Sequence, residues 1–172
     1  MGPFPKAVRN KKYLLVGIDY FTKWVEAEPL ANIRDVNVKR FVWKSIVTQI
    51  GVLHVLISDN GLQFDSKMFR KYCGELRIIN RYSTPAYPQG NGQAEAVNKV
   101  IVSGLKKRLD DAKGKWVKEL PHVLWTYRTT PRRSTGETPF SMTYGAEAVI
   151  PLKLVSRRQE PVHSIQRITM SN

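Results

Sequence analysis

The sequence predicts a domain of the α/β class whose strands run in mixed directions. Three observations support this fold class. Two strand-like stretches at 13–19 and 23–30 lie close enough to form a hairpin. A short, nearly all-apolar run at 54–58 is typical of a strand buried on both faces of a sheet. Segments with helical periodicity lie between and after these strands, which gives the element order of a mixed sheet covered by helices.

The first half of the chain alternates between strands and helices. After the hairpin, the expected elements are a helix at 35–49, a strand at 54–58, a helix at 65–76 and a strand at 77–82. Asp35 is the expected N-cap of the first helix, and Gly51 closes it. The strand at 54–58 ends at Asp59, within an Asp-Asn-Gly sequence that is typical of a turn. The carboxyl end of a buried strand is also where open α/β sheets place ligand sites.

A junction between a loop and a helix dominates the middle of the chain. Two prolines and two glycines within 85–92 predict a pliable loop. After it, apolar or small residues recur at helical spacing, namely Val97, Val100, Ile101, Gly104 and Leu105. Glu95 is then expected in the first turn of a helix, on a polar face with Asn98, Lys99 and Lys106. The simplest interpretation of Glu95 and Lys99 is an ion pair worth a few tenths of a kcal/mol.

Two further helices are expected before the pattern fades. Residues 116–130 carry Trp116, Leu120, Val123, Leu124 and Tyr127 at helical spacing, which favours core packing for these side chains. A short last helix is expected after Thr138 as N-cap, with Pro139 at its first position and Gly145 just past its end. We therefore predict a core domain over residues 1–150 and a loosely ordered basic tail over residues 151–172.

Thirty-five residues separate Asp59 from Glu95, which resembles the D-35-E half of a DDE polynucleotidyl transferase site. The whole chain up to about Pro151 resembles the integrase core of a gypsy-class long-terminal-repeat retrotransposon of the kind found in plants. The blocks that carry the resemblance are GPFPKA at 2–7, YLLVGIDYFTKWVEAEPL at 13–30, SDNGLQF at 58–64, STPAYPQGNGQAEAVNK at 83–99, LPHVLWTYRTTP at 120–131 and TPFSMTYG at 138–145. The third and fourth blocks are specific to this family.

The resemblance implies an RNase H-like mixed sheet flanked by helices, and DNA integration by metal-dependent polynucleotidyl transfer. It implies Mg²⁺ or Mn²⁺ as cofactor, since these hard cations bind carboxylate oxygens. Asp59 and Glu95 match two of the three catalytic, metal-binding acidic residues of the family. The family positions that contact DNA match Gln89 and Asn91 before Glu95, and Asn98 and Lys99 beside it. For each of these four residues, a turn or helix-surface role remains the alternative.

The first acidic residue of the family pattern is missing from this chain. The family places it in an Asp-x-x-Gly-Pro-Phe-Pro motif, of which Gly2 to Pro5 are the last four positions. The aspartate would precede Met1 by two residues, so the first strand is expected to be truncated. Asp19 ends a strand and is the weaker candidate for this ligand. Its alternative role is to cap the turn that follows.

The formal net charge of +14 and the sequence pI of about 10.1 favour a polyanionic partner. Lys106 and Lys107 belong to a basic group beside the Glu95 helix and are candidate DNA contacts, while a solvated basic surface is the alternative. No apolar run approaches the roughly 20 residues of a membrane span. Cys73 is the only cysteine, which excludes an internal disulfide and favours an intracellular protein. The resemblance implies retroelement ends and target DNA as partners. A homo-oligomer and a nuclear location also fit it.

Two functions from different classes therefore stand. The first is an integrase, or a fragment of one, that joins retroelement DNA ends to target DNA. The second is an RNase H-like module, from a decayed or reused element, that binds DNA without catalysis. The missing aspartate separates them, because two-metal transfer needs a carboxylate that bridges both ions.

Overall fold

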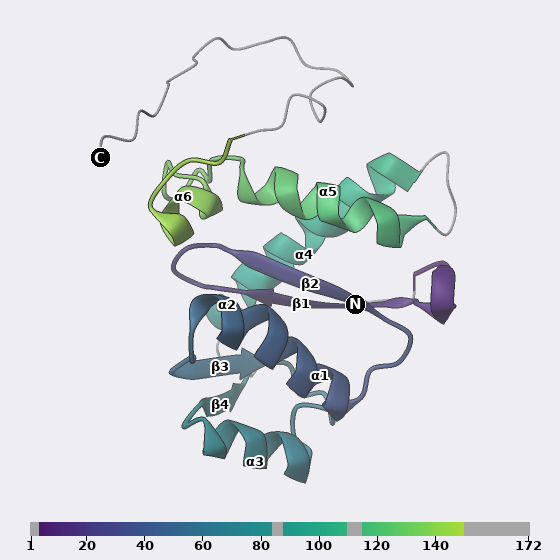
Figure 1. Cartoon of the computed structure of the whole chain (residues 1–172), viewed down its shortest axis with the longest axis vertical. Helices are drawn as coiled ribbons and strands as arrows, with labels where there is room; N and C mark the ends of the chain where they lie inside the picture. Colours follow the sequence, from purple (N-terminus) through teal and green to yellow (C-terminus); the bar gives the residue numbers. More distant parts are fainter. Residues whose placement is uncertain (1–3, 84–87, 110–114, 150–172) are drawn as a thin grey trace, which may run out of the picture.

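The computed structural model describes residues 4–83, 88–109 and 115–149 (Figure 1). The β1–β2 hairpin lies between the helices α4 and α5 on one side and a segment of α1, η2 and α2 on the other. The elements in chain order are η1 (Val8–Asn10), β1 (Tyr13–Ile18), β2 (Val25–Leu30), α1 (Asp35–Phe41), the π-helical turn η2 (Val42–Val47), α2 (Thr48–Ile50), β3 (Val55–Ser58), α3 (Lys67–Glu75), β4 (Ile79–Tyr82), α4 (Pro88–Leu109), α5 (Trp116–Arg128) and α6 (Pro139–Tyr144).

The four described strands form two separate two-stranded sheets. β1 pairs antiparallel with β2, from Tyr13 opposite Leu30 to Ile18 opposite Val25. β3 pairs parallel with β4, with Val55 opposite Ile79. The predicted α/β class and mixed strand directions are confirmed, and the strands are divided between two sheets rather than joined in one.

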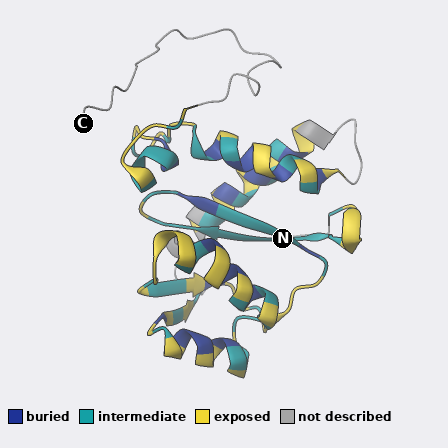
Figure 2. Ribbon diagram, in the orientation of Figure 1, coloured by how far each residue is buried: buried dark blue, intermediate teal, exposed yellow. Residues whose placement is uncertain are grey.

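Two apolar clusters hold these elements together, and Figure 2 shows their buried residues in dark blue on the inner faces of the helices. The first joins the hairpin to α4 and α5 through Leu14, Val25, Val97, Ile101, Leu105, Trp116, Leu120, Val123, Leu124 and Tyr127. The second joins α1 and η2 to α3 through Val38, Phe41, Val42, Phe69, Tyr72, Cys73 and Ile78. Each fully buried large side chain of this kind stabilises the fold by about 1.5–3 kcal/mol.

Two expectations for the first half need correction. The N-cap of α1 is Arg34 rather than Asp35, which is the first helical residue and accepts a hydrogen bond from the Val36 N–H at 2.8 Å. The strand β3 is not buried on both faces, since Ile57 is 43% exposed. Burial on both faces requires a covering layer on either side of the strand, and the face that carries Ile57 is left partly open.

The helix that carries Glu95 begins earlier than its sequence predicts. α4 starts at Pro88 and runs through both glycines, so Glu95 is not in its first turn. Proline fits the first position of a helix, and each internal glycine costs only about 1 kcal/mol. Val100 lies outside the expected apolar face, because it is 48% exposed. Gly104 lies against α5, where an added Cβ would be 3.0 Å from a Val123 methyl group.

The last two described helices match their predictions. Trp116 and Tyr127 of α5 are buried in the first cluster, as their spacing indicates. In α6, the Thr138 hydroxyl accepts a hydrogen bond from the Ser141 N–H, and Gly145 adopts the left-handed conformation with φ of 72°. Residues 150–172 lie outside the described ranges, so the division into a core at 1–150 and a tail at 151–172 stays a prediction.

Candidate metal and nucleic-acid site

Asp59 lies directly after β3, in the turn that its sequence predicts. Its Oδ1 atom accepts a hydrogen bond from the Gly61 N–H at 3.1 Å, and its side chain is exposed. Gly61 cannot be replaced without a shift, because an added Cβ would meet the Gln63 side chain at 2.2 Å. The strand end and its turn therefore present the Asp59 carboxylate to solvent.

Glu95 lies on α4, and two residues near it on this helix line the same pocket as Asp59. The Glu95 side chain is exposed, while Ala94 and Asn98 line the same pocket as Asp59. Lys99 is exposed on the same helix. Two segments far apart in sequence thus line one pocket, while the pairing of Asp59 with Glu95 stays a prediction.

The predicted loop conformation of the candidate DNA-contacting residues before Glu95 is wrong. Gln89 and Asn91 belong to the helix α4 and not to a loop, and their side chains lie outside what the structure describes. Asn98, expected on a polar face with Glu95, lines the pocket, and its buried Oδ1 atom has no hydrogen-bond partner among the described residues. The reason is the helical phase, which places Asn98 one residue after buried Val97.

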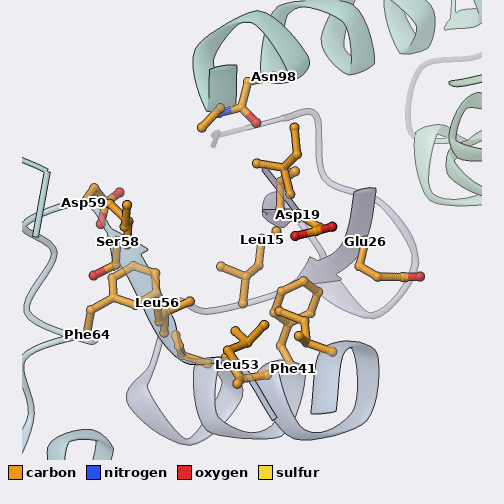
Figure 3. A pocket seen from close by; sticks show the side chains of 18 of the residues that line it. Leu15, Asp19, Glu26, Phe41, Leu53, Leu56, Ser58, Asp59, Phe64 and Asn98 are labelled. Atoms are coloured by element: carbon orange, nitrogen blue, oxygen red, sulfur yellow. The ribbon is translucent and has the colours of Figure 1, made fainter. Parts of the chain in front are cut away.

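The pocket between β1 and β3 is large and mostly apolar. It has a volume of about 520 Å³ and is lined by both strands, by the α1–η2 segment and by α4. Its only charged lining residues among those described are Asp19, Glu26 and Asp59. Figure 3 shows Asp59 at one side of the pocket, with Asp19 and Glu26 at the other and Asn98 above. The two aspartates therefore belong to opposite ends of the cavity.

Asp19 has the turn-capping role that was its alternative interpretation. Its Oδ2 atom accepts hydrogen bonds from the Thr22 N–H at 3.0 Å and from the Thr22 hydroxyl at 2.6 Å. These bonds fix the turn between β1 and β2. Within 4–83, 88–109 and 115–149, no group of three or more His, Cys, Asp or Glu side chains is placed to hold a metal ion.

The basic residues separate into exposed and structural ones. Lys106 and Lys107 are exposed on α4. Arg128 instead pairs with Glu26, with Nη2 at 2.6 Å from Oε1, and donates to the Val25 carbonyl. Arg132 donates to the Tyr127 carbonyl at 2.7 Å. Residue type alone does not separate these roles. Arg128 contacts β2, about a hundred residues earlier in the sequence, whereas Arg132 contacts Tyr127 at the end of the helix just before it.

Ser58 was not singled out by its sequence, although it borders the pocket next to Asp59. Its side chain is buried, and its Oγ atom has no hydrogen-bond partner among the described residues. A hydroxyl at the end of an apolar strand was the only available signal, and it does not distinguish a site from ordinary packing.

No family model matches the sequence. Among curated proteins, the chain is 34% identical over 134 residues to the Gag-Pol polyprotein of avian reticuloendotheliosis virus, covering 78% of the chain and 12% of that polyprotein. It is 37% identical over 137 residues to the Gag-Pol polyprotein of gibbon ape leukemia virus, covering 79% of the chain and 8% of that protein. With the feline leukemia virus polyprotein it shares 38% identity over 136 residues, with coverages of 78% and 8%. The chain thus spans about a tenth of the length of these relatives.

Solved structures show which fold this is. The HTLV-2 integrase catalytic core domain in complex with magnesium matches with a TM-score of 0.66 and 20% identity, covering 84% of this chain and all of that one. A chain of the simian T-cell lymphotropic virus intasome matches with a TM-score of 0.70 and 20% identity, covering 99% of this chain and 62% of that one. The BIV integrase catalytic core domain matches with a TM-score of 0.65 and 21% identity, with coverages of 77% and 85%.

The order of the elements and the match to these solved structures define an RNase H-like α/β fold. Its fold is that of integrase catalytic core domains, and its sequence is similar to a segment of retroviral Gag-Pol polyproteins. In the described part, no helix combines the length and apolar character needed to cross a membrane.

Proposed function

We propose that this chain is the integrase core-like domain of a plant gypsy-class retrotransposon and that it binds DNA in the course of DNA integration. The observation that carries the proposal is the meeting of two segments at one pocket: β3 with Asp59 at its end, and α4 with Glu95 exposed on its surface. The retroviral relatives and the integrase core fold support it. A nuclear location fits the proposed DNA partner, and a homo-oligomer fits the dimeric and trimeric forms of the HTLV-2 core.

The donor set fits a single divalent ion. The carboxylates of Asp59 and Glu95 are both exposed, and carboxylate oxygens are the ligands that Mg²⁺ and Mn²⁺ prefer. A bound ion would supply positive charge that stabilises a phosphate oxygen. Two carboxylates do not make a two-ion site, and the described residues hold no third acidic side chain beside them. We therefore assign these two residues to metal binding and derive no transfer step.

Titration with Mn²⁺ tests this assignment. Calorimetry should detect one weakly bound ion per chain, which is lost in Asp59→Asn and in Glu95→Gln. The control Asp19→Asn should keep the ion, because the Asp19 carboxylate is engaged by Thr22. Two tightly bound ions that both disappear in Asp19→Asn would instead identify Asp19 as a ligand and overturn the assignment.

DNA binding is proposed to use the exposed face of α4 around Glu95. Lys99, Lys106 and Lys107 are all exposed on it, and the chain as a whole carries a net charge of +14. Such contacts neutralise phosphates and release counterions, so each one lost should lower the slope of log affinity against log salt by about 0.9. Gln89, Asn91 and Asn98 remain proposed contacts near the DNA end. Sequence preference should be weak, because phosphates carry no base information.

Fluorescence anisotropy with a labelled DNA duplex measures this slope. The double substitution Lys106→Glu and Lys107→Glu should weaken binding at least tenfold and reduce the slope by about 2. Lys71→Glu on α3 is the control, since that side chain is 80% exposed and lies on the far side of the hairpin from α4. An affinity that does not change between low and moderate salt would remove the nucleic-acid proposal.

The second candidate function is the DNA-binding module without catalysis. The absence of a third carboxylate beside Asp59 and Glu95 in the described part favours it. A strand-transfer assay with a retroelement-end oligonucleotide and Mn²⁺ separates the two functions. We expect no product from the chain as given. Product that disappears in Glu95→Gln would establish the enzyme and exclude the non-catalytic module.

A further inference from the structure

A second cavity lies at the end of the hairpin where β1 begins and β2 ends, beside η1 (Figure 1). It has a volume of about 330 Å³ and is bordered by η1, by the β2–α1 connection and by the start of α1. Glu28 is its one acidic lining residue among those described, and none of its charged residues lines the pocket beside Asp59. Four cationic side chains line this cavity, which we call the basic recess: Arg9, Lys11, Arg34 and Arg40.

The positive charge of the basic recess exceeds its negative charge. The Glu28 carboxylate is already engaged, with Oε1 at 2.8 Å from Nη2 of Arg40. In the part of the chain that the structure describes, no carboxylate pairs with Arg9, Lys11 or Arg34. Arg40 also keeps further N–H groups for another acceptor, because a guanidinium carries several donors in a fixed fork. Cations held around one small space repel each other, and an anion bound between them offsets this repulsion.

Backbone hydrogen bonds hold the η1 wall of the recess in place. The Ala7 N–H donates to the Lys11 carbonyl at 2.9 Å, which closes the turn that contains Arg9. The Lys12 N–H donates to the Leu30 carbonyl at 3.0 Å, which ties the end of this turn to the end of β2. Two cationic side chains of the recess, Arg9 and Lys11, are thus anchored to the hairpin through their own backbone.

Two successive residues of η1 adopt a left-handed backbone. Arg9 has a φ of 60° and a ψ of 35°, and Asn10 has a φ of 56°. This conformation is uncommon for residues other than glycine, and it persists only where the surrounding structure enforces it. Strained residues of this kind cluster at sites that clamp ligands. Here the strained turn brings Arg9 and Lys11 to the same cavity.

The wall formed by the β2–α1 connection is fixed in a similar way. The Arg34 carbonyl accepts hydrogen bonds from the Asn37 N–H at 3.0 Å and from the Val38 N–H at 3.1 Å. The Asn37 side chain donates from Nδ2 to the Asn32 carbonyl at 2.8 Å, which ties the connection to the first turn of α1. Both walls are therefore built before any ligand binds, and such preorganisation lowers the cost of binding.

The size and charge of the basic recess define the class of its ligand. Its volume of about 330 Å³ lies at the lower end of the range of small-molecule sites, about 300–1,000 Å³, so it admits a small molecule and not a double helix. Arginine binds phosphate oxygens through two parallel N–H groups, which adds geometric specificity to the charge. Several cations around one space favour an anion that carries several adjacent negative charges over a single phosphate.

We propose that the basic recess binds a compact oligophosphate, either the phosphate chain of a nucleotide or a free polyphosphate. Arg9 and Lys11 bind it from the η1 side, and Arg34 binds it from the β2–α1 connection. Arg40 stays paired with Glu28 and contributes its remaining N–H groups. The site uses neither the Asp59 carboxylate nor the lysines of α4, so it is independent of the proposed metal and DNA sites.

Isothermal titration calorimetry of the full chain with tripolyphosphate tests the proposal. The buffer contains EDTA, so that no divalent ion can link the probe to Asp59 or Glu95. We expect one tripolyphosphate bound per chain, and inorganic phosphate should bind at least tenfold more weakly. ATP in the same buffer separates the two sources of the ligand. Tighter binding of ATP identifies a nucleotide, whereas equal or weaker binding identifies the phosphate chain alone, and either result supports the proposal.

Two charge-matched pairs of substitutions locate the site. Arg9→Asn combined with Arg34→Gln should weaken tripolyphosphate binding at least tenfold, and asparagine tolerates the left-handed backbone at position 9. Lys106→Gln combined with Lys107→Gln removes the same charge from the exposed face of α4. This control should change the affinity less than twofold, because neither lysine lines the recess. Lys11→Gln alone should weaken binding at least threefold, and it keeps the test decisive if the first pair does not fold.

Three results would overturn the inference. The first is an equal loss of affinity in both pairs, which would mean that the net charge of +14 attracts the anion without a defined site. The second is no binding, or several anions bound per chain. The third is a DNA duplex that displaces tripolyphosphate and is weakened as much by the Arg9 and Arg34 substitutions as by those at Lys106 and Lys107. That result would assign the recess to the DNA interface, whereas failure of the proposed function would show as lost DNA or Mn²⁺ binding.

Discussion

Replacing Arg128 by alanine tests whether this residue serves the fold and not a polyanionic partner. Its guanidinium lies 4.2 Å from the Trp24 ring centroid, donates to the Val25 carbonyl at 3.0 and 2.7 Å, and contacts Glu26 at 2.6 Å. The side chains of Arg128 and Glu26 are only 17% and 14% exposed. The substitution therefore leaves the largely buried Glu26 carboxylate without its ion-pair partner, with the Trp24 Nε1–H at 3.0 Å as its remaining hydrogen-bond donor among the described residues, and removes both hydrogen bonds to the Val25 carbonyl.

The size of the effect follows from this burial. Breaking a buried ion pair by removing one partner costs about 3–5 kcal/mol, a large share of a typical free energy of unfolding of about 5–15 kcal/mol. Arg40→Ala is the matched control, because Arg40 pairs at 2.8 Å with Glu28, two residues further along β2. The Arg40 side chain is 57% exposed, so its loss should cost no more than about 1 kcal/mol.

Urea denaturation at neutral pH, followed by circular dichroism, measures both costs. The double variant Arg128→Met with Glu26→Gln should recover much of the loss, because no unpaired charge remains. If Arg128→Ala costs no more than Arg40→Ala, the buried pair does not stabilise the fold as we reason. Weaker DNA binding at unchanged stability would then assign Arg128 to the nucleic-acid surface.

Two further predictions concern stability. Arg77 is exposed and has a φ of 56°, a conformation that costs a non-glycine residue about 1–2 kcal/mol. Arg77→Gly should therefore raise the free energy of unfolding by up to about 1 kcal/mol. A lower urea midpoint in this variant would contradict the prediction. Burial raises the pKa of the Cys73 thiol and of the Tyr127 hydroxyl above their ordinary values of 9.0 and 10.0. Because the unfolded chain loses these protons first, their stabilising contribution is complete below about pH 9 and declines as the pH rises further. Thermal unfolding from pH 7 to 10.5 should show a falling Tm that falls less in Tyr127→Phe, and an equal fall in that variant would contradict the assignment.

The sequence by itself determined the elements whose signals are local. Trp116 and Tyr127 mark a helix by their spacing, and Thr138 with Gly145 marks the two ends of α6. The end of β3 at Asp59 was equally readable, because an apolar run stops there at a turn sequence. These features depend on residues within one or two turns of each other. Such short-range preferences can be predicted from the sequence alone.

The candidate site itself was only half readable. The motifs around Asp59 and Glu95 single out both residues as candidates, since each motif is a contiguous block of sequence, and their metal-binding role stays a prediction. The start of α4 at Pro88 could not be predicted from the sequence. Packing of the buried face of α4 outweighs the low helix propensity of its glycines. The inward face of Asn98 depends on the same helical phase.

Only the tertiary structure decided how distant segments use their polar groups. Arg128 meets Glu26 across about a hundred residues of sequence, and the same residue type on α1 stays exposed. β1 and β3 line one cavity because two apolar clusters hold the hairpin and the parallel strands on either side of it. No local pattern encodes such a meeting, because it depends on the burial of surfaces contributed by the whole chain.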